Sequence, residues 1–246
     1  MTQGRKETGR SRLTETVREC LRKHPVFSQF RQTNWVELLQ RSRIAEPRQG
    51  EVICHEWQKA EQAWLLLEGE VKLLRHTTKG QVLLVDLVLS GDLFGAVFYA
   101  GHPIHPVTAV AMKKTKLFAF PLAVLLDELR TNDLLQMALL EDTCIKLCQS
   151  IAMRGLGLED VPVRVASILC RLQEKFGAVI PETRATIAEL AGTTTESAIR
   201  ITRAMEKEGV VRLSRGKIEV LSQDRLSEMA GVSFRPLGLQ PEGAFV

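Results

Sequence analysis

Residues 183–210 read TRATIAELAGTTTESAIRITRAMEKEGV, and this stretch decides the fold of the C-terminal part of the chain. Gly192 separates two short amphipathic segments, and glycine accepts the left-handed backbone that a sharp turn between two helices needs. Thr193 or Thr194 then provides an N-cap for the second segment. The pattern predicts a helix-turn-helix, a motif that places the N-terminal part of its second helix in the major groove of DNA.

The second segment has an apolar side and a polar side at helical spacing. The residues expected to face inward are Ala198, Ile201, Ala204 and Met205, and those expected to face outward are Thr195, Glu196, Ile199, Arg200 and Arg203. Arg200 can bond a guanine at two points, and Glu196 can accept a hydrogen bond from cytosine N4 or complete a capping box. Arg184, Thr194 and Arg203 suit phosphates, whose contacts position a protein without specifying a sequence.

A basic segment follows the second helix. Residues 210–220 predict two short strands around Arg215, Gly216 and Lys217, which would form a basic wing beside that helix. Residues 163–217 hold ten Lys and Arg against six Asp and Glu, a net charge of +4, and residues 1–23 hold seven against three, again +4. Since the whole chain carries +4, the rest carries −4. The excess positive charge therefore lies where DNA would be met, and the alternative for both segments is a solvated surface.

The pattern upstream is typical of strands. Short apolar runs separated by glycine turns occupy residues 50–54, 63–67, 71–76, 81–89 and 107–120. Strands at this spacing predict a small β-barrel or sandwich. Apolar residues at helical spacing predict helices over residues 26–42, 121–129, 132–158 and 163–176, with a break at Gly155, Gly157 and Pro162.

The helix expected over residues 132–158 is about 40 Å long, more than a barrel of this size can cover. Its apolar seam recurs at spacings of three and four residues and consists of Met137, Leu140, Cys144, Leu147 and Ile151. This pattern favours a homodimer seam, and the alternative is a core helix within one chain. Cys148 lies on the same face as Cys144, so the pair can form an interchain disulfide, hold a metal, or serve as two small apolar side chains.

Composition excludes several classes of protein. The 246 residues are 45% hydrophobic and 25% charged, the profile of a soluble globular protein. Five cysteines lie far apart, which fits a reducing cytoplasm better than a disulfide framework. The N-terminus has no apolar signal segment, and the uncharged stretch from Leu93 to Met112 is broken by glycines and prolines, so we expect no membrane partner. No nucleophile elbow, phosphate loop or zinc-protease motif occurs, so we expect no enzyme, no catalytic residue and no metal site.

The order of β-barrel, long helix, hinge and winged helix-turn-helix resembles the CRP/FNR family of bacterial transcription regulators. The resemblance covers residues 26–230 and rests on Gly69 after a Leu-Leu-Leu-Glu strand, on Gly91-Asp92-Leu93-Phe94-Gly95, and on Thr183-Arg184, Ile187-Ala188, Gly192, Glu196-Ser197 and Arg200. It implies a cytoplasmic homodimer that binds a palindromic operator on double-stranded DNA and acts on RNA polymerase. It also implies that Glu196 and Arg200 read bases, with Ser197 in the same DNA-binding set. Thr195 stands where cAMP-responsive members carry an arginine, which points to a half-site of the FNR branch.

The sequence departs from the cAMP-binding members of that family. Those members carry a glutamate after the Gly-Asp-x-x-Gly motif and an Arg-Ser pair further on, whereas this chain has Ala96 and then Pro106 and Val107. No positive charge occurs from Leu93 to Met112, so a buried cyclic phosphate would lack its counter-charge. We therefore expect no cAMP binding. An FNR-type iron–sulfur cluster needs three cysteines near the N-terminus, and only Cys20 lies there, so we expect no such cluster.

The effector stays open at this point. The candidate effector pocket consists of Phe94, Phe98, Tyr99, His102 and His105, in an apolar loop. One of its histidines can ligate haem iron, as in some gas-sensing members of the family, and the alternative is a surface loop stiffened by proline. A haem- or thiol-based gas or redox sensor, and a cyclic-nucleotide-binding-like regulatory module of another assembly, are the competing functions.

The expected fold class is α+β. It comprises an N-terminal cyclic-nucleotide-binding-like β-barrel (a double-stranded β-helix or jelly roll), a long dimerisation helix and a C-terminal winged helix-turn-helix. The expected domains are a basic flexible arm over residues 1–25, the β-barrel sensor over 26–130, the dimerisation helix over 131–160, the DNA-binding domain over 161–231 and a flexible tail over 232–246.

Overall fold

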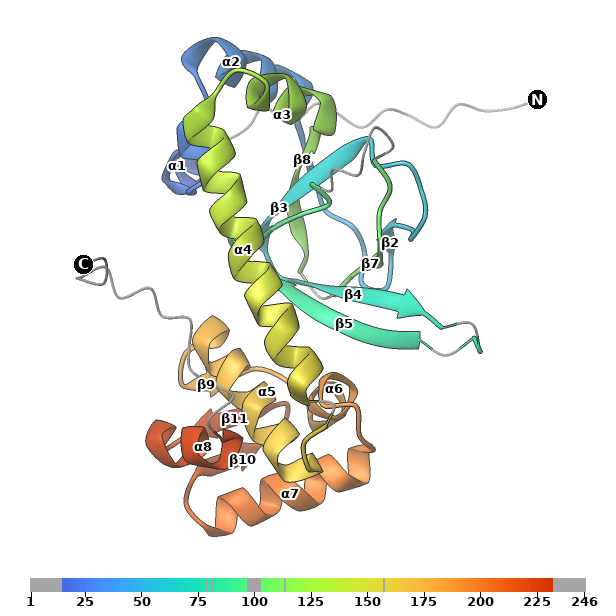
Figure 1. Ribbon diagram of the computed structural model, residues 1–246, viewed down its shortest axis with the longest axis vertical. Helices are drawn as coiled ribbons and strands as arrows, with labels where there is room; N and C mark the ends of the chain where they lie inside the picture. Colours follow the sequence, from blue (N-terminus) through green and yellow to red (C-terminus); the bar gives the residue numbers. More distant parts are fainter. Residues whose placement is uncertain are drawn as a thin grey trace. The chain divides into compact units, whose positions relative to one another are not determined.

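The structure is a computed structural model that describes residues 15–77, 79–80, 82–96, 103–112, 114–156 and 158–231 (Figure 1). The side chains of residues 16, 149 and 151–156 lie outside this description. The chain forms two compact units, Met1–Glu141 and Asp142–Val246. Among the described residues, none of the helices combines the length and the apolarity that a membrane crossing requires.

The first unit combines helices with two antiparallel sheets. Its helices are α1 (Glu15–Lys23), the 3₁₀ helix η1 (Phe27–Gln29), α2 (Gln32–Arg41), α3 (Leu122–Leu129) and the start of α4 (Asp133–Leu156). The strands are β1 (Arg43–Ala45), β2 (Val52–Cys54), β3 (Gln62–Glu68), β4 (Glu70–His76), β5 (Val82–Leu89), β6 (Leu93–Phe94), β7 (Thr108–Ala111) and β8 (Lys116–Pro121). One sheet has the order β1-β8-β3-β6 and the other β2-β7-β4-β5, so the expected β-sandwich is confirmed.

Strands β3 and β8 of the first sheet are buried on both faces. Their side chains in the core between the two sheets are Trp64, Leu66, Leu117 and Ala119. Their side chains in the core shared with the helices are Ala63, Leu65, Phe118 and Phe120. Successive side chains of a strand point to opposite faces, so a strand covered on both sides reads as one continuous apolar run. This accounts for the unbroken apolar stretch at residues 63–67.

Phe27 of η1 joins the N-terminal helices to this sheet. Its side chain is 1% exposed. Its ring packs edge-on against Phe118 and Phe120, with centroids 5.8 and 5.3 Å away. Edge-to-face pairs of this kind each contribute about 0.5–1.5 kcal/mol beyond the area they bury. Phe27 thus anchors η1 over the outer face of the sheet.

A buried carboxylate connects α2, α3 and the start of α4. Glu128 in α3 has no exposed surface, and it accepts hydrogen bonds from the backbone N–H and the Nε of Arg31, both at 3.0 Å. Asn34 and Asn132 also donate to it. Asn132 caps α4, because its side-chain oxygen accepts from the backbone N–H of Leu135 at 3.1 Å. Burial raises the pKa of Glu128, but the hydrogen bonds from Arg31, Asn132 and Asn34 together lower it by more than burial raises it. The pKa therefore lies below its ordinary value.

The substitution Glu128→Gln is expected to lower the free energy of unfolding of the first unit by about 2 kcal/mol at pH 7, because charge-assisted hydrogen bonds to buried groups are lost. The folded-state pKa of Glu128 is lowered, so its contribution is present above the ordinary glutamate pKa of about 4.3 and disappears as the pH falls through the lowered value. Urea unfolding of both proteins across this pH range measures the difference.

Glu37→Gln is the matched control for this prediction. Glu37 pairs with Arg41 at 2.7 Å, but both side chains are half exposed. An exposed pair at helical spacing contributes only about 0.3–0.5 kcal/mol. An equal loss in both variants, or a Glu128→Gln effect that does not shrink at acidic pH, would contradict the assignment of Glu128 as an ionised, buried link.

In the described part of the chain, the second unit packs four helices that follow α4 together with a small sheet. Its elements after α4 are α5 (Val161–Phe176), β9 (Val179–Ile180), α6 (Arg184–Leu190), α7 (Thr195–Lys207), β10 (Val211–Ser214), β11 (Lys217–Val220) and α8 (Gln223–Ala230). The sheet order is β10-β11-β9. Residues 165–172 of α5 are all buried, and α5 packs against α6, α7 and α8. Gly177 ends α5 as expected, with a φ of +79°.

Three expectations are wrong. The segment expected as a flexible arm forms α1 over Glu15–Lys23, because Val17 and Leu21 insert into the core, while residues 1–14 lie outside the described residues. The helix expected over residues 26–42 is interrupted between η1 and α2, where Phe30 and Arg31 are extended. That extension places the N–H of Arg31 on Glu128. The break expected at Gly155 is also absent: α4 ends at Leu156, two residues before the expected end at residue 158, and one glycine costs a helix only about 1 kcal/mol.

Candidate nucleic-acid interface

The turn between α6 and α7 follows a standard helix-ending pattern. The N–H of Gly192 donates to the carbonyl of Glu189 at 3.3 Å, and the N–H of Thr193 donates to the carbonyl of Ala188 at 2.9 Å. This is the Schellman motif, which satisfies the last carbonyls of a helix through a left-handed residue. Gly192 has a φ of +59°, and a Cβ there would meet no atom within 4 Å. The backbone conformation, rather than lack of space, therefore requires glycine.

Helix α7 begins at a threonine cap. Thr194 is the N-cap, because its side-chain oxygen accepts from the backbone N–H of Ser197 at 3.2 Å. Of the two threonines that the sequence left open, Thr194 therefore has this role. A capping box needs a Glu or Gln at the third helical position, which is occupied by Ser197. Glu196 is exposed at the second helical position and therefore does not complete a capping box.

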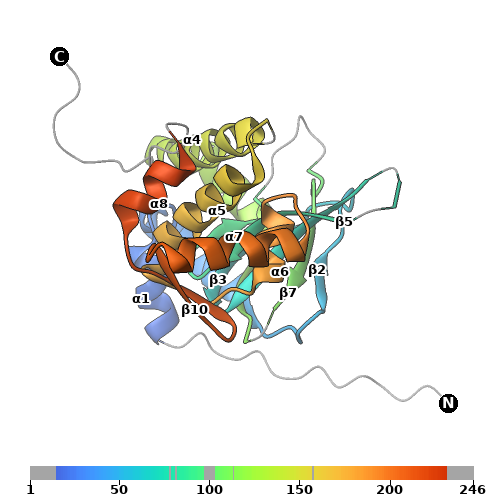
Figure 2. The same cartoon turned by 90° about the horizontal axis from the view of Figure 1, so that it is seen from below.

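One face of α7 packs into the second unit and the other is exposed (Figure 2). The buried side chains are Ala198, Ile201, Thr202 and Met205. The exposed ones include Thr195, Glu196, Arg200 and Arg203. Ala204 was expected to face inward and is exposed instead. Thr202 takes the buried place, because its hydroxyl donates to the carbonyl of Ala198 at 2.8 Å and is thereby satisfied.

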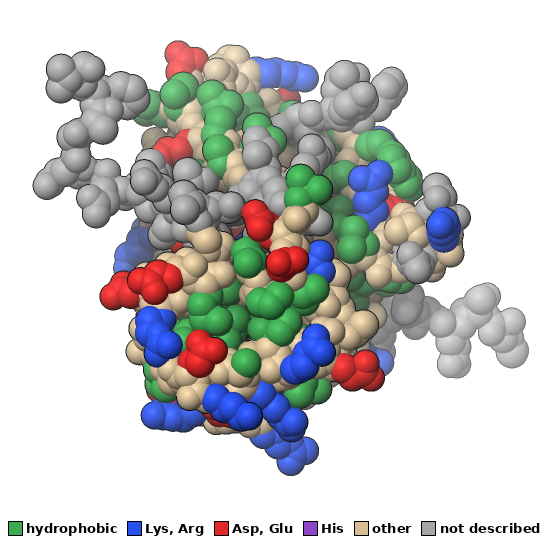
Figure 3. Space-filling view, turned by 60° about the horizontal axis from the view of Figure 1, so that its bottom comes forward, with side chains coloured by type: hydrophobic (Ala, Val, Ile, Leu, Met, Phe, Trp, Pro, Cys, Tyr) green, Lys and Arg blue, Asp and Glu red, His purple; other side chains and the backbone are tan. Residues whose placement is uncertain are grey.

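Five basic side chains of α6, α7 and the β10–β11 hairpin have no ion-pair partner among the described residues: Arg184, Arg200, Arg203, Arg215 and Lys217. Two other basic side chains of the unit are engaged in ion pairs. Arg212 pairs with Glu219 at 2.7 Å, and Arg225 donates to the carbonyl of Glu208 at 2.5 Å. Figure 3 shows Lys and Arg side chains along the edges of this end of the molecule. The unpaired cations are the ones that an anionic ligand can reach.

The hairpin β10–β11 forms the expected wing, with Arg215 and Gly216 at its turn. It is attached to α7 by a hydrogen bond that the sequence did not reveal. The carboxylate of Glu206 in α7 accepts from the backbone N–H of Leu213 in β10 at 2.8 Å. The N–H of Val210 also donates to the carbonyl of Met205 at 2.9 Å. The wing and the helix are therefore fixed to each other.

Arg164 is a second residue that sequence reasoning missed. It lies near the start of α5, and its Nη2 donates to the carbonyl of Gly192 at 3.4 Å. It thereby links α5 to the turn of the motif. The sequence offered no signal for this role, because Arg164 and Gly192 are 28 residues apart.

Two residues of the candidate effector pocket meet at Trp64. Its ring lies 5.3 Å from that of Phe94 and 5.4 Å from that of His105, between centroids, and both neighbours are buried. Burial lowers the pKa of His105, which favours the neutral imidazole. A Cβ at Gly95 would lie 2.6 Å from the Trp64 ring, so glycine is needed there. Phe98, Tyr99 and His102 lie outside the described residues.

The outer side of α4 is apolar and exposed. Leu134, Met137, Leu140 and Leu147 are each more than half exposed, while Leu135 and Leu139 on the opposite side pack into the core of the first unit. Cys144 and Cys148 are exposed as well. The side chain of Ile151, the last residue of the expected seam, is outside the described part of the chain.

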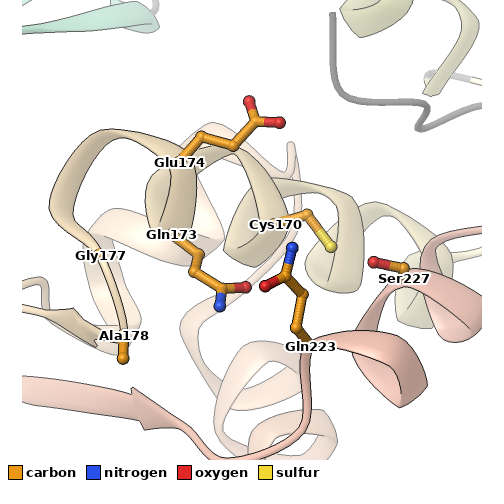
Figure 4. A pocket seen from close by; sticks show the side chains of 7 residues that line it. All are labelled: Cys170, Gln173, Glu174, Gly177, Ala178, Gln223 and Ser227. Atoms are coloured by element: carbon orange, nitrogen blue, oxygen red, sulfur yellow. The ribbon is translucent and has the colours of Figure 1, made fainter. Parts of the chain in front are cut away.

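Other candidate sites are less suited to ligands. Among the described residues, no three His, Cys, Asp or Glu side chains come together as metal ligands. A pocket of about 410 Å³ in the second unit is lined by Cys170, Gln173, Glu174, Gly177, Ala178, Gln223 and Ser227 (Figure 4). None of these residues is basic, so the pocket does not suit a phosphate. Burial raises the pKa of Cys170 to about 11, which keeps its thiol protonated and unreactive.

Comparison with known proteins agrees with this architecture. Residues 46–132 match the family model of the cyclic nucleotide-binding domain, and residues 163–229 match that of the Crp-like helix-turn-helix domain. The cyclic AMP receptor protein of Thermus thermophilus is 29% identical over 184 residues, which cover 74% of this chain and 85% of that protein. The global nitrogen regulator of Synechococcus elongatus is 24% identical over 75% of this chain and 88% of that protein.

Solved structures show the same fold. FixK2 from Bradyrhizobium japonicum has a TM-score of 0.70 at 21% identity, over 76% of this chain and 96% of that chain. A transcriptional regulator of the crp/fnr family from Eubacterium rectale has a TM-score of 0.63 at 19% identity, over 84% of this chain and 97% of that chain. A cyclic-nucleotide-binding-like β-sandwich followed by a Crp-like helix-turn-helix defines a DNA-binding transcription regulator, not an enzyme. The chain belongs to the CRP/FNR family.

Proposed function

We propose that this regulator is a cytoplasmic homodimer that binds a palindromic operator with α7 in the major groove and acts on RNA polymerase from there. The observation that carries this proposal is the exposed first half of α7, with Glu196 and Arg200 exposed and Arg203 one helical turn after Arg200. Transcription by RNA polymerase from a promoter with the operator, compared with one whose operator is scrambled, tests the last step. A change on both promoters or on neither would contradict it.

Base recognition is assigned to the start of α7. Arg200 can donate two hydrogen bonds to a guanine, and Glu196 can accept from cytosine N4. Thr194, Thr195 and Ser197 at the same end of the helix complete the contact surface. The threonine at position 195 supports a half-site of the FNR branch, as the resemblance to that branch implies.

Phosphate contacts are assigned to the cations around that surface. Arg184 at the start of α6, Arg203 in α7, and Arg215 and Lys217 at the tip of the wing are without an ion pair among the described residues. Contacts of this kind fix the register of a protein on the duplex, and they make binding depend on salt.

Arg200→Ala is expected to weaken binding to the preferred operator by about 1–3 kcal/mol, or about 5–150-fold, and to relax the preference at one base position of each half-site. Arg203→Ala is expected to weaken binding to all sequences alike and to reduce the salt dependence. Fluorescence anisotropy with an inverted repeat, selected by the protein from random DNA, measures both changes at several salt concentrations.

Arg225→Ala is the control, because its guanidinium is already engaged with Glu208. We expect its affinity and base preference to match those of the unsubstituted protein. If Arg200→Ala kept full base preference, or if Arg225→Ala lost as much affinity, α7 would not be the reading helix.

Dimerisation is assigned to the outer side of α4. Exposed apolar side chains at spacings of three and four residues are typical of a helix that packs on another helix. The opposite side of α4 is already occupied by the core of the first unit. A second copy of α4 is self-complementary to this stripe, and a two-fold dimer matches the two halves of a palindrome.

Leu147→Glu is expected to convert the protein to a monomer at micromolar concentration, because it places a charge in the apolar seam. It is also expected to weaken operator binding. Analytical ultracentrifugation measures the mass. Leu221→Glu replaces a similarly exposed leucine that is not part of α4 and should leave the dimer intact. A dimer that survives Leu147→Glu with unchanged dissociation would place the interface elsewhere.

We also propose that the sensor domain does not bind cAMP, although the relative from Thermus thermophilus is named for that ligand. The support is the absence of any Lys or Arg from Leu93 to Met112, where a cyclic phosphate would need a counter-charge. Isothermal titration of the protein with cAMP is expected to give no heat of binding. Saturable binding at micromolar concentration would overturn this proposal.

A further inference from the structure

We propose that Cys144 is a peroxide-sensitive cross-linking site that joins the two chains of the dimer through a Cys144–Cys144 disulfide. This inference rests on the α4 dimer proposed above. Of the five cysteines, Cys54 and Cys170 are buried, and burial raises the pKa of each thiol to about 11, whereas Cys20, Cys144 and Cys148 are exposed. Only exposed thiols can meet an oxidant and a second chain.

Among the exposed cysteines, Cys144 is chosen for the cross-link because of its position in the exposed apolar stripe of α4. Met137, Leu140, Cys144 and Leu147 follow one another at spacings of three, four and three residues. In a heptad, Met137 and Cys144 are therefore a positions, and Leu140 and Leu147 are d positions. Cys144 lies at the centre of the exposed stripe, between Leu140 and Leu147, which are 54% and 57% exposed.

The two helices must run parallel for the dimer to read one operator. Both recognition modules follow the C-terminal end of α4 in their chains, and both must reach the same duplex. Residues at a positions of parallel paired helices face each other across the two-fold axis. Cys144 of one chain then lies opposite Cys144 of the other, whereas in an antiparallel pair it would not.

The expected Cα–Cα distances between the two helices allow a disulfide at Cys144 but not at Cys148. Helix axes about 8–10 Å apart, with Cα atoms about 2.3 Å from each axis, put the Cα atoms of an a–a pair about 5 Å apart and those of an e–e pair about 9 Å apart. A disulfide needs about 4.4–6.8 Å, so Cys144 meets the requirement and Cys148, at an e position, does not. Within one helix, Cβ atoms four residues apart are about 5–6 Å from each other, too far for a bond between Cys144 and Cys148.

The reaction balances with hydrogen peroxide as the oxidant. Peroxide oxidises one Cys144 thiol to a sulfenic acid and releases water. The Sγ of the other Cys144 then attacks this sulfur, the S–S bond forms, and a second water leaves. In sum, two thiols and one peroxide give one disulfide and two waters. Cellular dithiols reduce it again by exchange, so the link lasts only while the oxidant is present.

The test uses the full chain, reduced and then freed of reductant. Light scattering in reducing buffer first gives the mass, which we expect to be twice the 27.5 kDa of one chain. Peroxide treatment followed by non-reducing electrophoresis is expected to give a band at that doubled mass that dithiothreitol removes. Cys144→Ser and Cys144→Ala should both abolish the band, and Cys148→Ser and Cys20→Ser should keep it.

Operator binding at high dilution gives a functional readout. Cross-linked protein should keep its affinity on dilution, whereas reduced protein and Cys144→Ser should lose affinity as the dimer dissociates. A dimer in reducing buffer that forms no Cys144-dependent band overturns the cross-link and leaves the α4 dimer standing. A monomer in reducing buffer overturns the dimer and the cross-link with it. A band that persists in the Cys144 variants also overturns the cross-link.

Discussion

The ionised carboxylate of Glu128 is the contact on which the helical half of the first unit depends. A charge without exposed surface is stable only where donors surround it. Here the donors come from the residue before α2, from α2 itself and from the turn before α4. One group therefore sets the positions of three elements. Asn132 both donates to Glu128 and caps α4, so the helix that carries the apolar stripe begins at a fixed place.

The helix-turn-helix could be predicted because its determinants are local. Gly192 supplies the left-handed residue and Thr194 the cap, and both act on backbone groups within a few residues. The strands of the sandwich were also visible, since a sheet covered on both sides leaves an unbroken apolar run. Long-range contacts were not visible. Arg31 and Asn34 meet Glu128 across 97 and 94 residues, and no short pattern records such a pair.

Helix α1 could not be predicted either, because its burial depends on distant parts of the chain. Val17 and Leu21 are two apolar residues in a segment rich in charge, which reads as a solvated arm. They are buried because the core formed by η1, α2 and the first sheet offers them a place. The ion pairs of the exposed basic residues could not be predicted from the sequence either. Sequence counts alone cannot separate Arg212, which is paired with Glu219, from Arg200, which has no ion-pair partner among the described residues.

The bond from Glu206 to the N–H of Leu213 has a consequence for the lifetime of the complex with DNA. Since this hydrogen bond and the one between Val210 and Met205 hold the hairpin against α7 before any duplex binds, the entropy of ordering the hairpin is lost during folding and not at the moment of binding. In the proposed complex, α7 and the hairpin would therefore contact and leave a half-site together. Each half-site would then be bound and released in one step, without an intermediate in which only the helix or only the hairpin contacts the DNA.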